Sequence, residues 1–75
     1  MAVQLAQGLV IVADEVAFAS DDFPLLVIDT VDPGMRSFRV VASEAWGPIA
    51  NLPIANMDWE DFADHVDPDG VHRGF

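Results

Sequence analysis

The stretch LLVIDTVDPGMRSFRVVAS, residues 25–43, decides the fold because two strand-like runs flank the clearest turn of the chain. The first run, residues 25–31, is rich in β-branched side chains and begins with a continuous apolar segment. Pro33 presets the φ angle of the second turn position, and Gly34 accepts a positive φ at the third. The second run, residues 37–43, alternates apolar and polar side chains. We therefore expect these two runs to pair as an antiparallel hairpin.

The segments on either side also indicate strands. Residues 8–13, GLVIVA, are rich in β-branched side chains and predict a strand. Residues 14–20 alternate around Val16 and Phe18, which predicts a second strand segment after a bend. Residues 49–54, IANLPI, predict a short last strand, with its proline at an edge or at the strand end.

The end of the chain predicts one short helix. Asn56 or Asp58 can cap its N-terminus, and the acids that follow lie in the first turn, where the helix dipole favours anions. An apolar stripe recurs at spacings of three and four, formed by Trp59, Phe62, Ala63 and Val66. The proline and glycine of DPDG, residues 67–70, stop the helix. Residues 67–75 are expected to form a flexible tail.

These elements predict a mainly β fold with a minor α part. The expected architecture is a small antiparallel barrel of about four or five strands with one short C-terminal helix. Residues 1–75 form a single domain at this length. The expected core is aliphatic and aromatic, and its members are Val16, Phe18, Leu26, Ile28, Phe38, Val40, Leu52 and Ile54.

Residues 14–43 carry a family resemblance. Asp14 and Val16 fit the Gly-Asp-x-Val start of small SH3-like barrels, with Ala13 in the place of the usual glycine. The Pro24-Leu25 pair fits the next element, a polar loop that ends in a proline and an apolar strand. The segment thus resembles the opening of SH3-like barrels, including the YodC-like bacterial proteins. The resemblance implies the barrel fold and carries over no catalytic residue.

Charge restricts the partners. Thirteen acids, ten of them aspartate, face three bases, which are Arg36, Arg39 and Arg73, and the chain has no lysine. Such a chain repels phosphate backbones and anionic lipid, so we expect no direct nucleic-acid binding and no membrane binding. No apolar run reaches the length of about 18 residues that spans a bilayer. A basic surface, a cation or water remains as the counterpart of the acids.

No pattern of catalytic chemistry is present in the sequence. Cysteine is absent, and no serine lies in a nucleophile-elbow motif. The segment DHVDPDGVH, residues 64–72, offers aspartates and histidines, but their spacing matches no zinc site or calcium loop. We therefore expect a protein that is not an enzyme and that holds no metal and no cofactor.

The candidate partner-binding residues are acids off the helix stripe, acids of a polar loop, and two aromatic side chains. Trp46 lies in the turn EAWGP, where it either packs beneath the barrel or is exposed as a partner anchor. Phe23 lies in a loop before proline and is a second expected anchor. The full set is Asp21, Asp22, Phe23, Trp46, Asp58, Glu60, Asp61 and Asp64.

Two functions follow from these observations. The first is a small acidic binding module, an inhibitor or nucleic-acid mimic of the kind that phages and mobile elements encode, such as an anti-CRISPR protein. Its partner would be a basic nucleic-acid-binding protein or effector complex. The alternative is a structural domain with a solvated acidic surface from a salt-adapted or high-GC organism. We expect a cytoplasmic protein, in the host cytoplasm if phage-encoded, and its apolar composition also allows a homodimer.

Overall fold

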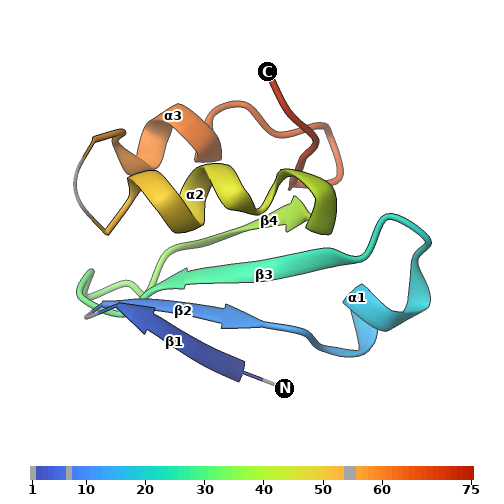
Figure 1. Cartoon of the computed structure of the whole chain (residues 1–75), viewed down its shortest axis with the longest axis horizontal. Helices are drawn as coiled ribbons and strands as arrows, with labels where there is room; N and C mark the ends of the chain where they lie inside the picture. The colour runs from blue at the N-terminus through green and yellow to red at the C-terminus, as the bar shows by residue number, and fades with distance from the viewer. Residues whose placement is uncertain (1, 7, 54–55) are drawn as a thin grey trace.

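One mixed β-sheet with short helices forms the molecule (Figure 1). The computed structural model describes residues 2–6, 8–53 and 56–75. The strands follow one another across the sheet in chain order, and β5 is parallel to β4 whereas the other neighbours are antiparallel. The elements are β1 (Ala2–Ala6), β2 (Leu9–Val12), α1 (Glu15–Ala19), β3 (Pro24–Asp29), β4 (Ser37–Val41), the 3-10 helix η1 (Ala42–Glu44), α2 (Trp46–Asn51), α3 (Trp59–Ala63) and β5 (Val71–His72).

The hairpin predicted around the DPG turn is confirmed. β3 and β4 pair antiparallel, with Val27 opposite Phe38. The turn is closed by a hydrogen bond from the backbone N–H of Met35 to the carbonyl of Asp32, at 2.8 Å. The positive φ of this turn lies at Met35 (49°) and not at Gly34, where we expected it. The carboxylate of Asp32 accepts the Gly34 N–H at 3.0 Å, which fixes the turn from within.

The strand predicted over residues 8–13 is β2, and a further strand precedes it. β1 pairs antiparallel with β2, so that β1 forms one edge of the sheet. Gly8 lies between them with a φ of 89°, a left-handed conformation that glycine adopts without strain. A side chain at Gly8 would also collide with Val31. Both constraints require glycine where the chain turns from β1 into β2.

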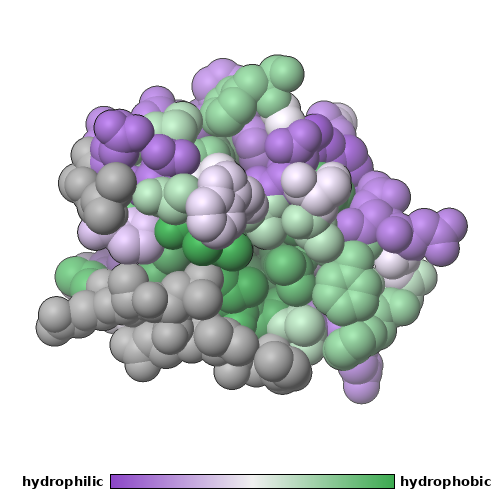
Figure 2. Space-filling view, viewed as in Figure 1, coloured by the Kyte–Doolittle hydropathy of each residue, from purple (hydrophilic) through white to green (hydrophobic). Residues whose placement is uncertain are grey.

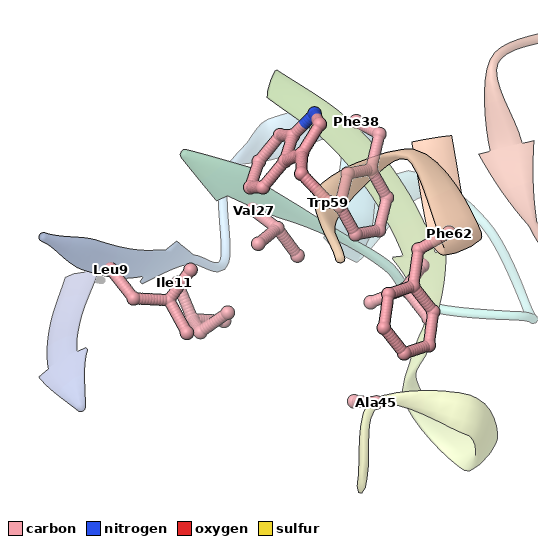
Figure 3. Close-up of a cluster of buried hydrophobic side chains, with 8 residues drawn as sticks. Leu9, Ile11, Val27, Phe38, Ala45, Trp59 and Phe62 are labelled. Atoms are coloured by element: carbon pink, nitrogen blue, oxygen red, sulfur yellow. The ribbon is translucent and has the colours of Figure 1, made fainter. Parts of the chain in front are cut away.

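The helix layer on one face of the sheet holds the core (Figures 1 and 3). Leu9 and Ile11 of β2 and Val27 of β3 point from the sheet toward Trp59 and Phe62 of α3. The helix stripe predicted from the spacing is confirmed, because Trp59 and Phe62 are buried. Further residues of α2, α3 and the loops complete this layer by packing against the cluster, among them Ile49, Leu52, Met57, Ala63 and Val66.

α1 occupies residues for which we expected a strand. Asp14 is its N-cap, and the Asp14 carboxylate accepts the backbone N–H of Ala17 at 3.1 Å. Such a cap begins a helix where the alternation of Val16 and Phe18 indicated a strand. Ala17 is fully buried, whereas Val16 is 50 % and Phe18 66 % exposed. The expectation that Val16 and Phe18 belong to the core is therefore wrong.

α2 replaces the expected last strand over residues 49–54. Pro48 lies in the first turn of α2, where the missing N–H breaks no helical hydrogen bond, so Gly47-Pro48 opens a helix. The side-chain amide of Asn51 donates to the carbonyl of Gly47 at 2.7 Å and supports this short helix. Leu52 packs against the core as expected. Ile54, which we also expected in the core, lies outside the described residues.

The segment 67–75, expected as a flexible tail, contains β5. The backbone N–H of Gly70 donates to the Asp67 carbonyl at 2.8 Å, which closes a turn, and Gly70 takes a φ of 81°. After this turn β5 lies beside β4, with Arg39 opposite Val71. The side chains of Val71 and His72 are both buried.

The expected mainly β SH3-like barrel is wrong, and the fold is α+β. The described strands form an open series with β1 and β5 at its edges, and the helices are spread along the chain rather than gathered in one C-terminal element. Of the expected core, Phe38 and Val40 lie in the buried cluster. Leu26 and Ile28 are only half-buried, because they alternate with Val27 and face away from α2 and α3.

Two phenylalanine variants distinguish this fold from the barrel. Phe38→Ala should lower the free energy of unfolding by about 3–5 kcal/mol, because it removes a ring packed against Trp59 and Phe62. Phe18→Ala should lower it by much less, about 1 kcal/mol, since the Phe18 ring is exposed and meets the Phe23 ring edge-on. Chemical denaturation followed by circular dichroism measures both. Equal losses for the two variants would contradict the fold.

Candidate functional site

Arg39 and Asp14 form a bidentate ion pair that fixes α1 to the sheet. The guanidinium Nη1 donates to Asp14 Oδ1 at 3.0 Å and Nη2 to Oδ2 at 2.7 Å, and Nη1 also donates to the carbonyl of Pro24 at 3.0 Å. The guanidinium and the backbone N–H of Ala17 hold the pKa of the Asp14 carboxyl far below its ordinary value. The Arg39 cation is thus fully engaged inside the molecule.

Arg36 is engaged on the other side of the sheet. Its Nε donates to Asp29 Oδ2 at 2.9 Å, its Nη1 to Glu60 Oε1 at 3.1 Å, and its guanidinium carbon lies 5.0 Å from the centre of the Trp59 ring. Partial burial acts to raise the pKa of Asp29, but hydrogen bonds from Arg36 and from the backbone N–H groups of Asp32 and Val31 outweigh it and lower that pKa.

Arg73 joins the loop after α1 to the turn before β5. Its Nε donates to Asp22 at 3.1 Å, its Nη1 to Asp67 at 2.7 Å, and its Nη2 to Asp69 at 2.8 Å. These hydrogen bonds raise the pKa of Arg73, and in return they lower the pKa of Asp69. The three arginines together pair with six carboxylates.

Seven acids have no arginine partner among the described residues, and three of them, Asp58, Asp61 and Asp64, lie on α3 or cap it. In that part of the chain they are Glu15, Asp21, Asp32, Glu44, Asp58, Asp61 and Asp64. Figure 2 shows hydrophilic residues gathered over the region of α3 and the loop that follows it, and hydrophobic residues over α1. The acidic excess therefore reaches the surface unevenly.

The four predicted acids of α3 lie together and have different roles. Asp58 is the N-cap, and its backbone N–H donates to Asp61 Oδ2 at 2.8 Å in a capping box. Glu60 pairs with Arg36. Asp64 is the C-cap residue and is exposed. Two of the four acids thus stabilise the helix start, one neutralises an arginine, and one serves neither purpose.

The predicted loop acids form a separate group from those of α3. The loop between α1 and β3 lies at the opposite end of the molecule from the start of α3 (Figure 1). Asp22 pairs with Arg73, whereas Asp21 is exposed and has no ion pair with a described residue. Phe23 is half-buried with a φ of 52°, and its ring lies 5.0 Å from the Phe18 ring in an edge-to-face arrangement. The structure thus places the predicted loop acids apart from the start of α3.

Trp46 is 75 % exposed, which decides between the two readings of this residue. Sequence analysis did not identify Phe75 as a candidate, although its ring is 78 % exposed at the end of the chain. It packs edge-on against His72 at 4.8 Å and lies 5.2 Å from His65. His72 itself is buried, with its Nδ1 2.8 Å from the carbonyl of His65. The sequence alone did not indicate these contacts, because they form only when β5 pairs with β4.

The described residues also line a cavity, whose charged groups are paired. A surface cavity of about 250 Å³ lies beside Trp59, and its charged groups Arg36 and Asp29 already pair with each other. Within residues 2–6, 8–53 and 56–75, no group of three His, Asp or Glu side chains is placed to hold a metal ion. Over the same residues, no helix has the length and apolar character needed to cross a membrane.

The Asp14–Arg39 pair predicts how stability depends on pH. The folded-state pKa of Asp14 is lowered, so its contribution is present above the ordinary aspartate pKa of about 4 and is lost as the pH falls below it. Asp14→Asn should lower the melting temperature at pH 7 and should show a smaller further loss between about pH 4 and pH 2 than the parent. Thermal melts across this range test it; parallel curves for the two proteins would contradict the role of the pair.

Comparison with known proteins adds a family and no activity. No curated protein and no solved structure matches the chain. One family model matches residues 2–75, and its description is "Domain of unknown function (DUF6924)". The match covers β1 to β5 and every residue of the candidate site. The chain therefore belongs to the DUF6924 family.

Proposed function

We propose that this chain is a small protein-binding module whose acidic helix layer engages a basic surface of a nucleic-acid-binding protein, as an inhibitor or nucleic-acid mimic in the cytoplasm. One observation carries the proposal. All three arginines are engaged with other acids and the chain has no lysine, so Asp58, Asp61 and Asp64 keep their charge uncompensated by any described cation.

A rigid scaffold supports this use of the carboxylates. α3 is docked by two buried aromatic side chains, Trp59 and Phe62, and its start is held by the Asp58–Asp61 capping box. Carboxylates fixed in this way create a negative field that steers a basic partner toward the surface and accelerates association. Each exposed contact contributes little, about 1 kcal/mol or less, so the acids act collectively.

A solvated structural domain is the second candidate, and the capping box favours it. Asp58 and Asp61 stabilise the first turn of α3, so a part of the acidic excess serves the fold and requires no partner. Both candidates share the same structure. They differ in one expected result. For a binding module, neutralising surface acids weakens binding to the partner while the free energy of unfolding stays the same; for a structural domain there is no such loss of binding.

Neutral amides separate the two roles better than charge reversal. Lysine at position 58 or 61 would destroy the capping box, whereas asparagine keeps an oxygen that accepts the same backbone hydrogen bond. Asp61→Asn with Asp64→Asn removes two charges from the helix layer. Glu15→Gln with Asp32→Asn removes two charges from α1 and the β3–β4 turn. Both variants change the formal net charge of −10 by the same amount.

The proposal predicts a location-dependent loss of binding. The immobilised parent should capture a basic nucleic-acid-binding protein from lysate at about 0.05 M salt and release it at about 0.5 M salt, because added ions screen the exposed charges. The amount of that protein captured should fall at least about threefold for the helix-layer variant, Asp61→Asn with Asp64→Asn. The variant in α1 and the turn, Glu15→Gln with Asp32→Asn, should capture as much as the parent. Quantitative mass spectrometry of the captured proteins gives the readout. Capture of no basic protein, or equal loss in both variants, would favour the solvated structural domain.

A further inference from the structure

Trp46 is a large ring held out in solvent by a fixed backbone. It is 75 % exposed, although its neighbours Ala45 and Pro48 are buried. Gly47 packs so closely on the ring of Phe62 that an added methyl group would press on that ring. The backbone of α2 at Trp46 is therefore fixed to the core while the indole points outward. Exposed tryptophan on a rigid element is typical of protein interfaces.

Phe75 emerges at the same end of the helix layer. Its ring is 78 % exposed, and its centre lies 5.8 Å from that of Phe62, the same ring that Gly47 contacts. Gly74 also lies against the side chain of Glu44. Gly47 at the start of α2 and Phe75 at the end of the chain thus both lie beside Phe62 of α3. We call the exposed groups there, Trp46, Phe75, Glu44 and Asp64, the Trp46 surface.

Charge decides what fits the Trp46 surface. Glu44 and Asp64 are exposed, and neither pairs with an arginine of the described chain. A second copy of this chain brings a formal net charge of −10 and no lysine, and its three arginines are engaged. A basic segment of another protein is the complementary occupant.

The molecule itself contains the interaction that such an occupant would make. The guanidinium of Arg36 lies 5.0 Å from the centre of the Trp59 ring, and it donates to the carboxylate of the adjacent Glu60 at 3.1 Å. Trp46 and Glu44 present the same two chemical groups, an indole face and a carboxylate two positions away, with no arginine of the described chain paired to Glu44. Trp46 is also largely exposed, whereas Trp59 is buried.

We propose that the Trp46 surface binds an arginine- or lysine-bearing segment of a protein partner. The cationic head lies on the Trp46 indole and pairs with Glu44 or Asp64, and Phe75 contacts the apolar stem or a neighbouring apolar side chain. The inference rests on the proposed function and deepens it, because it names the part of the partner that is bound and the anchor that binds it.

The test uses a defined probe. A labelled synthetic peptide with alternating arginine and leucine is titrated with the parent protein, and its counterpart with citrulline in place of arginine has the same shape without the charge. The parent should bind the arginine peptide about fivefold more tightly than the citrulline peptide, or more tightly still. Trp46→Ala should remove about the same factor, and Trp46→Phe should retain part of it. Phe18→Ala removes an equally exposed ring from α1 and should leave the affinity unchanged.

Several results would overturn the inference. They are equal affinity for both peptides, an unchanged affinity after Trp46→Ala, or a dimer of the parent in sedimentation that Trp46→Ala converts to a monomer. Circular dichroism and the fluorescence of buried Trp59 verify that the Trp46 variants fold. In lysate capture, a basic protein that is lost with the helix-layer variant but kept with Trp46→Ala would sustain the proposed function and reject the Trp46 surface. Capture of no basic protein would reject the proposed function, while the peptide titration still decides on the surface.

Discussion

The contact between Phe38 of β4 and the two aromatic side chains of α3 is the interaction on which the rest of the structure depends. The Phe38 ring meets Trp59 edge-on at 4.8 Å and lies parallel to Phe62 at 6.2 Å. Edge-to-face and offset parallel arrangements are the favourable ones for aromatic pairs. This contact fixes α3 on the sheet, and through Phe62 it also fixes the start of α2 and the C-terminal residues. In a chain of 75 residues a small core must do this work without disulfides.

The distribution of charge follows from this scaffold. The three arginines lie where separate segments must be joined: α1 to the sheet, the β3 end to α3, and the loop after α1 to the turn before β5. Their partners are therefore the acids at these junctions. The acids left over lie mainly on short helices and loops at the surface, where water hydrates them. The acidic surface is thus a consequence of how few cations the chain has and where the fold uses them.

The sequence predicted those parts that local chemistry determines. The DPG turn predicted the β3–β4 hairpin, and the spacing of Trp59 and Phe62 after a capping aspartate predicted α3 and its buried face. α1 was mistaken for a strand because five residues cannot distinguish a period of two from a short helix around Ala17. α2 was mistaken because Gly47-Pro48 fits a turn as well as a first helical turn. β5 depends on pairing with a strand some thirty positions earlier in the chain, for which no local signal exists.

The candidate site, like the fold, could be predicted from the sequence only in part. The surface position of the α3 acids followed from their place off the apolar stripe. Their separation from Asp21 and Asp22 could not be predicted from the sequence, because it depends on long-range ion pairs. The Asp22–Arg73 pair joins residues 51 positions apart, and the Asp14–Arg39 pair joins residues 25 positions apart. The exposure of Trp46 was open until the fold placed it at the start of α2. Long-range pairing thus decides which acids remain available.

A double-mutant cycle between Phe38 and Trp59 tests the central contact most directly. Phe38→Leu, Trp59→Leu and the double variant keep the sites apolar, and denaturation followed by circular dichroism gives the free energy of unfolding of each. We expect a coupling energy of about 0.5–1.5 kcal/mol, because the rings contact each other edge-on at 4.8 Å. Additive losses, with a coupling energy below about 0.3 kcal/mol, would contradict the docking of α3 on β4 through these rings.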